Sequence, residues 1–162
     1  MGDAITDRPS ILTYALVFGR VGWTTLCNWF VGLTPEDNHG AKGNAWARID
    51  AYRWAAWHFR KYLKYSDTSS ARASLAWCYA NLGMAEEAVQ QYRLAYARNK
   101  SPMIALYLAE AEFNLGNIEA AQSLFTAAAA RREEFEGEAS SAFVELERKL
   151  KSRSPQGSSD AV

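Results

Sequence analysis

Apolar and amphipathic stretches dominate the chain, and their spacing predicts helices throughout. The most apolar stretch is residues 11–33, ILTYALVFGRVGWTTLCNWFVGL. These 23 residues are roughly as long as a helix that crosses a bilayer. However, Arg20 lies near the middle, where inserting a cation costs about 2.5–3.5 kcal/mol. We expect a helix that is buried in the protein, associated with a membrane, or docked into a partner, with four marker residues: Arg20, Trp23, Trp29 and Phe30.

A polar stretch and an aromatic one follow the apolar segment. Residues 34–44, TPEDNHGAKGN, contain Pro35, Gly40 and Gly43, and this composition predicts a polar loop. Residues 45–65 carry seven aromatic side chains and predict a second helix. We expect the helices over residues 11–33 and 45–65 to pack against each other, with the aromatic rings in their shared interface.

The next part of the chain repeats with an offset of 33 residues. The matching pairs are Leu75 with Leu108, Ala76 with Ala109, Leu82 with Leu115, Gly83 with Gly116, Ala88 with Ala121, Tyr92 with Phe125, Ala95 with Ala128, and Arg98 with Arg131. Each repeat predicts two helices that are joined by a turn after Asn-Leu-Gly. Glycine suits this position because helices often end in a left-handed residue.

These residues resemble the tetratricopeptide repeat (TPR) family. Residues 69–101 and 102–134 match its Leu and small residue on the first helix, its Gly at the turn, and its Ala–aromatic–Ala pattern on the second helix. Both lack the tryptophan of the motif, with Arg72 and Ala105 in its place. The resemblance implies an all-α, TPR-like right-handed superhelix of antiparallel helix pairs, preceded here by the N-terminal apolar helix.

The resemblance also implies a concave groove lined by the first helix of each repeat. The carried-over positions are Ser70, Ala73, Trp77, Ala80 and Asn81, then Met103, Leu106, Glu110, Phe113 and Asn114. The partner-binding residues that we expect among them are Trp77, Asn81, Met103, Leu106, Glu110, Phe113 and Asn114. Because none is Lys or Arg, a clamp for a C-terminal carboxylate is not expected. An apolar helix, or an extended peptide with an apolar anchor, suits this groove.

Residues 138–151 predict a helix that caps the last repeat. Ala142, Phe143, Leu146 and Leu150 form one apolar face, and charged residues cover the rest, as a terminal repeat requires. The predicted organisation is a tail (1–10), an apolar helix (11–33), a polar loop (34–44), a TPR-like domain (45–152) and a disordered tail (153–162).

Composition and charge mainly exclude certain classes of protein. The 162 residues suffice for one domain, and 18 Lys and Arg balance 18 Asp and Glu, so a dedicated nucleic-acid binder is not expected. Within this neutral total, residues 41–64 carry six basic residues against one acidic, a net charge of +5. Pairing with the acidic flanks is the simplest explanation. Contact with RNA or a nucleotide through these basic residues is the alternative, namely Arg48, Arg53, Arg60, Lys61 and Lys64.

We find no catalytic constellation in the sequence. Cys27 and Cys78 lie in apolar contexts and are predicted to be small buried hydrophobes. His58 is predicted to lie at a helix surface or interface. We therefore expect no enzyme, no cofactor, no metal site and no small-molecule substrate.

The sequence favours a non-enzymatic scaffold or adaptor that binds a protein segment in its groove, as part of a larger complex in the cytoplasm. The alternative is a membrane-anchored subunit of a membrane protein complex. It would be inserted through residues 11–33 and located at the membrane surface.

Overall fold

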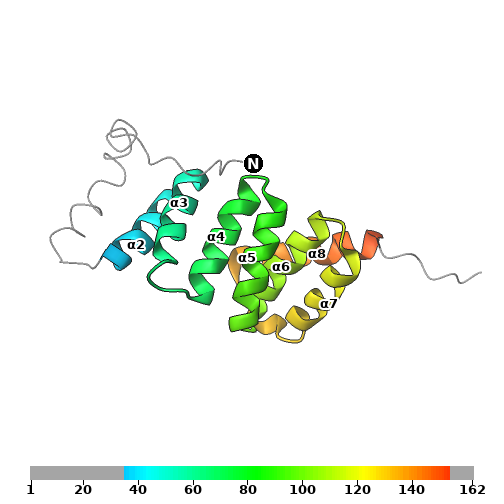
Figure 1. The fold of residues 1–162 in the computed structure, drawn as a ribbon. Helices are drawn as coiled ribbons and strands as arrows, with labels where there is room; N and C mark the ends of the chain where they lie inside the picture. The colour runs from blue at the N-terminus through cyan, green and yellow to red at the C-terminus, as the bar shows by residue number, and fades with distance from the viewer. Residues whose placement is uncertain (1–34, 154–162) are drawn as a thin grey trace, which may run out of the picture. The chain divides into compact units, whose positions relative to one another are not determined.

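The computed structural model describes residues 35–153, and all regular structure in that range is helical. Residues 1–34, and with them the predicted apolar helix, lie outside the described residues, as do residues 154–162. The helices are α2 (Pro35–Ala47), α3 (Tyr52–Tyr62), α4 (Ser69–Asn81), α5 (Ala85–Arg98), α6 (Pro102–Asn114), α7 (Ile118–Ala129), the short 3-10 helix η1 (Arg132–Glu134) and α8 (Gly137–Arg153). The all-α prediction is confirmed for this part of the chain (Figure 1).

The described residues form two compact units, 35–98 and 99–153. In the first unit α2 packs on α3, α3 on α4, and α4 on α5, and consecutive helices run antiparallel (Figure 1). Large and very small side chains alternate in its core, which comprises Trp46, Ala55, Ala56, Phe59, Leu75, Cys78, Tyr79 and Ala88. The small residues let the helix backbones approach closely, and the rings fill the remaining space.

The prediction of a polar loop over residues 34–44 is wrong, because this stretch begins helix α2. Pro35 is the first helical residue, a position where proline loses no helical hydrogen bond. The two glycines mark close contacts rather than turns. A Cβ on Gly43 would lie 2.8 Å from a ring carbon of Phe59, and one on Gly40 would lie 3.2 Å from the ring of Tyr62. Glycine thus brings the α2 backbone against the aromatic side of α3.

The single helix predicted over residues 45–65 is correspondingly divided. Its first residues complete α2, and Trp46 is buried there, only 2% exposed. The chain then turns through Asp50, whose φ of 59° is left-handed, before α3 begins. The hairpin partner of α3 in the described structure is therefore α2, a contact that the sequence analysis missed.

The predicted turns between paired helices are confirmed. Gly83 and Gly116 follow α4 and α6 with φ of 73° and 82°. The same two backbone hydrogen bonds close both helix ends: Met84 N–H to Tyr79 O (2.9 Å) and Gly83 N–H to Ala80 O (3.1 Å), then Asn117 N–H to Glu112 O (2.9 Å) and Gly116 N–H to Phe113 O (2.9 Å). This is the Schellman arrangement, and it recurs with the sequence repeat.

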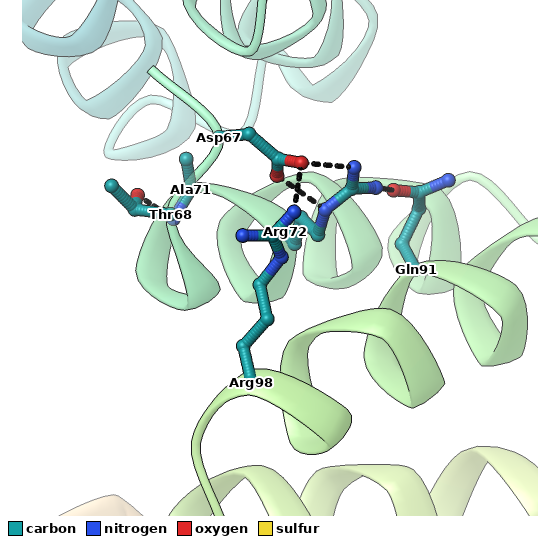
Figure 2. Close-up of polar contacts among 6 residues, drawn as sticks. All are labelled: Asp67, Thr68, Ala71, Arg72, Gln91 and Arg98. Atoms are coloured by element: carbon teal, nitrogen blue, oxygen red, sulfur yellow. Dashed lines mark hydrogen bonds and ion pairs between the residues drawn. The ribbon is translucent and has the colours of Figure 1, made fainter.

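Arg72, which replaces the tryptophan of the TPR motif, ties α4 to its neighbours through Asp67. The Asp67 carboxylate accepts hydrogen bonds from Arg72 Nε (2.5 Å) and Nη2 (2.8 Å), and it also pairs with Arg98 at the end of α5. Figure 2 shows the two guanidinium groups converging on this carboxylate, while Arg72 also donates to Gln91 (2.9 Å). The hydrogen bond from Arg72 and the charges of both arginines lower the pKa of Asp67. The neighbouring Thr68 caps α4 by accepting the Ala71 N–H (3.2 Å).

The second unit consists of the α6–α7 pair with α8 packed against both. The buried face of α8 is formed by Ala139, Phe143, Leu146 and Leu150. The ring of Phe143 lies 4.6 Å from that of Phe125 on α7. On the outer side, ion pairs such as Arg148 with Glu145 (2.7 Å) keep the surface polar. The predicted capping helix is thus present, with Ala139 buried where the sequence analysis favoured Ala142.

A pair of histidines joins α2 to α3. His58 is 1% exposed, and its Nδ1 lies 3.0 Å from Nδ1 of His39. One of these two nitrogens therefore carries the hydrogen and donates the hydrogen bond, and the other accepts it. Burial, followed by the charges of His39 and Lys42, lowers the pKa of His58 to about 3. The predicted interfacial position of His58 is confirmed, and the residue is neutral at physiological pH.

We predict that Gly43→Ala destabilises the protein by about 1–3 kcal/mol, because the added methyl group overlaps the buried ring of Phe59. Ala normally stabilises a helix by about 1 kcal/mol relative to Gly, so the expected sign is opposite to that of helix propensity. Urea denaturation measures the change. In a Phe59→Leu background the penalty should shrink. A Gly43→Ala protein as stable as the wild type would contradict the close approach of α2 to α3.

We also predict that acidification from pH 7 to 5 weakens the fold through His58. In this window unfolded His58, with a pKa near 6.5, binds a proton that folded His58, with a pKa of about 3, does not bind. The unfolded state therefore gains stability as the pH falls, by about 2 kcal/mol from this group. Denaturation of wild type and His58→Leu across this range tests the prediction. The variant should show a flatter profile, and an unchanged slope would refute the assignment to His58.

Candidate functional site

The residues predicted to contact a partner fall into one group on α4 and another on α6. In the first unit, Trp77 is 38% exposed and Asn81 is also exposed. In the second unit, Asn114 is exposed and Met103 and Glu110 are half-buried, whereas Leu106 and Phe113 are buried, with exposures of 1% and 9%. The structure therefore offers surface at five of the seven positions.

One row of side chains on α4 is exposed or half-buried. Ser70, Ser74, Trp77 and Asn81 follow the spacing i, i+4, i+7, i+11, which places them in line along a helix. The opposite side, including Leu75 and Cys78, is buried. We call this row the α4 face. It spans about 16 Å, enough for about five residues of an extended segment.

Trp77 is held in place at the C-terminal half of the α4 face. Its indole meets the ring of Tyr52 edge-on, with centroids 5.1 Å apart at 84°. The Tyr52 hydroxyl donates to the Asp50 carboxylate (2.6 Å), and this bond raises the pKa of Tyr52. The Asn81 side chain donates to the Trp77 carbonyl (2.9 Å). The indole is thus both exposed and supported, so a ligand can pack on it at a low entropic cost.

An open cleft of about 290 Å³ borders the N-terminal half of the α4 face. Hydroxyl and amide groups share its walls with two aromatic rings, and the lining residues are Gly40, Asn44, Phe59, Tyr62, Thr68, Ser70, Ala71 and Ser74. Ser70 and Ser74 belong to the α4 face, so the cleft adjoins it directly. Hydroxyls and carboxamides can both donate and accept hydrogen bonds, as the backbone of a bound segment requires.

The second unit has an equivalent row on α6. Met103, Tyr107, Glu110 and Asn114 stand 33 positions after the four residues of the α4 face, with the same spacing. Ser74 and Tyr107 were not among the positions taken from the TPR motif. They could have been found from helical periodicity, because each lies four residues after a predicted position, Ser70 or Met103. We call this second row the α6 face.

Leu106 and Phe113 lie on another side of α6, which corrects the expectation that they line an open surface. Leu106 is among the largest fully buried side chains of the described structure. The Arg153 guanidinium at the end of α8 lies 5.1 Å from the centroid of the Phe113 ring. Both residues therefore stabilise the unit rather than offer contact surface.

Two titratable side chains near these rows, Cys78 and Glu112, are buried. Cys78 is fully buried as predicted, and burial raises the pKa of its thiol to about 12, so no nucleophilic thiolate forms at neutral pH. The buried Glu112 accepts a hydrogen bond from the Asn117 carboxamide (2.8 Å). In the part of the chain that the structure describes, no three His, Cys, Asp or Glu residues converge as metal ligands would.

The predicted markers of the apolar segment lie outside the described residues, namely Arg20, Trp23, Trp29 and Phe30, and so does Cys27. Among the helices of residues 35–153, none has the combination of length and apolar character that a membrane span requires.

Comparison with solved structures identifies similar folds. PcrH in complex with the chaperone-binding region of PopD has a TM-score of 0.63 at 20% identity, covering 75% of this chain and 93% of PcrH. PcrH from Pseudomonas aeruginosa has a TM-score of 0.62 at 20% identity, with 75% and 94% covered. PcrH with the chaperone-binding region of PopB has a TM-score of 0.59 at 21% identity, with 75% and 97% covered.

No protein-family model matches the sequence, and no curated protein is significantly similar to it. The likeness is therefore one of fold. Together with the repeated helix pairs, it shows that the described part of the chain has an all-helical, TPR-like fold.

Proposed function

We propose that this chain is a non-enzymatic adaptor that binds a segment of another protein along the α4 face. One observation carries the proposal: Trp77 is 38% exposed, yet the ring of Tyr52 packs edge-on against its indole, in a row that also lines a cleft. Rigid, exposed indoles of this kind are typical hot spots of protein interfaces. The structures of PcrH with regions of PopD and PopB support a protein segment as the ligand of such a fold.

The chemistry of the α4 face suggests what the segment carries. None of its four side chains is charged, so the ligand needs no compensating charge there. An apolar anchor residue would pack on the Trp77–Tyr52 pair. The hydroxyl groups of Ser70 and Ser74 would form hydrogen bonds with the backbone of the segment near the cleft. This division between an anchor and backbone contacts suits an extended peptide.

The α6 face would serve the second unit in the same way. Met103 supplies an adaptable apolar contact, and Glu110 favours a ligand that carries a cation or a hydrogen-bond donor at that point. Tyr107 joins Met103, Glu110 and Asn114 as a contact residue, while Leu106 and Phe113 support the fold.

Two further parts of the proposal rest on the sequence. One is membership in a larger complex, and the other is the alternative of a membrane-anchored subunit that is inserted through residues 11–33. Carbonate extraction of membranes separates an inserted chain, which stays with the lipid, from a peripheral one, which is released.

We predict that Trp77→Ala weakens the binding of a peptide selected against the full chain from a random display library by tenfold or more, as expected when a hot spot of about 2 kcal/mol is lost. Leu94→Ala is the matched control, because Leu94 lies in the same unit on α5 and is similarly exposed, at 41%. Isothermal titration of both variants with the selected peptides measures the difference. The proposed site would be contradicted if the two variants bound the selected peptides with equal affinity, or if neither substitution weakened binding.

A further inference from the structure

The cleft beside the α4 face is uncharged. Its walls include Asn44 of α2, Phe59 and Tyr62 of α3, and Ser70 and Ser74 of α4, and none of its eight lining residues carries a charge. The proposed function uses the cleft only for contacts with the backbone of a bound segment. The chemistry of the walls also limits which side chain of that segment can enter.

Three polar groups on the walls are available to a ligand. Within the described residues, the Asn44 carboxamide and the hydroxyls of Ser70 and Ser74 form no hydrogen bond with another part of the chain. By contrast, the Thr68 hydroxyl already accepts the Ala71 N–H (3.2 Å). A serine hydroxyl donates once and accepts twice, so it can contact the backbone of a segment and also bond to one of its side chains.

The cleft is small, and its aromatic wall is held in place. The α2 backbone packs on both rings, because a Cβ on Gly40 would lie 3.2 Å from the Tyr62 ring and one on Gly43 would lie 2.8 Å from the Phe59 ring. The volume of about 290 Å³ lies at the lower limit of small-molecule pockets, which range from about 300 to 1,000 Å³. A cleft of this size suits a single side chain.

These properties select against three kinds of side chain. A charged side chain would lose hydration in the cleft without meeting an opposite charge on the lining residues. An apolar side chain would cover the hydroxyls and the carboxamide and leave them without partners. A hydroxyl side chain donates only one hydrogen bond. A carboxamide is neutral and planar, and it offers two donors together with an acceptor oxygen.

Helix geometry indicates where in the segment this side chain lies. Along the axis of α4, Ser74 is about 4.5 Å and Ser70 about 10.5 Å from Trp77. Side chains on one face of an extended segment recur every two residues, about 6.7 Å apart. A side chain two positions from a residue that packs on Trp77 would therefore lie between the two serines, at the cleft.

We propose that the cleft binds the carboxamide of a Gln or Asn that lies two positions from the apolar anchor of the bound segment. The inference rests on the proposed function, because it takes Trp77 as the site of the anchor. It adds a specificity for one neutral polar side chain, which the packing of an anchor on Trp77 does not require.

The probes are peptides selected from a random display library against the full chain and sorted by whether Trp77→Ala weakens their binding. Most of the Trp77-dependent peptides should carry Gln or Asn two positions from an apolar residue. In a synthetic copy of one such peptide, replacement of the carboxamide residue by Glu or by Leu should weaken binding about tenfold, because polar groups of the cleft lose their partners. Isothermal titration measures the change.

Variants of the protein test the cleft from the other side. Asn44→Ala and Ser74→Ala should each reduce the preference for the carboxamide peptide over the leucine peptide to less than about threefold, because each removes a hydrogen-bonding group from the wall. Alanine favours helix, so both variants should fold, and circular dichroism verifies this. Gln90→Ala is the matched control, since it removes an exposed carboxamide from α5 in the same unit, and it should keep the full preference.

The outcomes separate the inference from the proposed function. If Trp77→Ala leaves the affinity of the selected peptides unchanged, the proposed function is wrong and the inference with it. Two results would show that only the inference is wrong: Trp77-dependent peptides that bind equally well with Glu or Leu in place of the carboxamide residue, or a preference that is the same in Asn44→Ala, Ser74→Ala and Gln90→Ala.

Discussion

Close approach of helix backbones is the constraint on which the structure depends. At the points of contact the side chains are fully buried alanines, such as Ala55, Ala76 and Ala88 in the first unit and Ala109 and Ala121 in the second. The approach is closest at Gly43, where even a methyl group would overlap a ring of α3. Larger residues at these points would force the helices apart, and the rings that now fill the gaps would lose their contacts.

This packing also determines which side chains of α4 remain accessible to a ligand. Ala71, Leu75, Ala76, Cys78 and Tyr79 of α4 are buried by this packing, whereas the Ser70–Asn81 row keeps exposed surface. That row contains no acid, base or nucleophile of unusual reactivity, and the buried thiol of Cys78 stays protonated. A rigid row with one supported indole is the basis of the proposal that α4 binds a chain segment.

The parts of the structure that sequence analysis predicted are those in which local geometry demands a particular residue. Gly83 and Gly116 mark helix ends because few other residues adopt their left-handed backbone. The apolar face of α8 follows from periodicity alone. By contrast, Gly40 and Gly43 resemble turn residues in the sequence, and only the distant rings of Phe59 and Tyr62 reveal their role in close packing.

The surroundings of the proposed binding site were predicted only in part for a similar reason. Trp77 and Asn81 were found through the family pattern, and the structure adds that Tyr52 and Asp50 hold the indole in place. These contacts join α4 to residues about twenty-five positions earlier, a distance over which a single sequence carries no signal. Leu106 was predicted to be exposed because a family motif identifies the helix on which a residue lies. The motif does not show which rows of that helix stay exposed, because this depends on how the helix packs.

Photocross-linking in the native cell tests the central claim most directly, with a photoreactive residue at position 77 on the α4 face and, for comparison, at position 94 on α5. The account predicts that position 77 becomes attached to one defined segment of another protein, which mass spectrometry can map, and that position 94 does not. Attachment of both positions to the same set of proteins, or of position 77 only to residues of this chain, would contradict it.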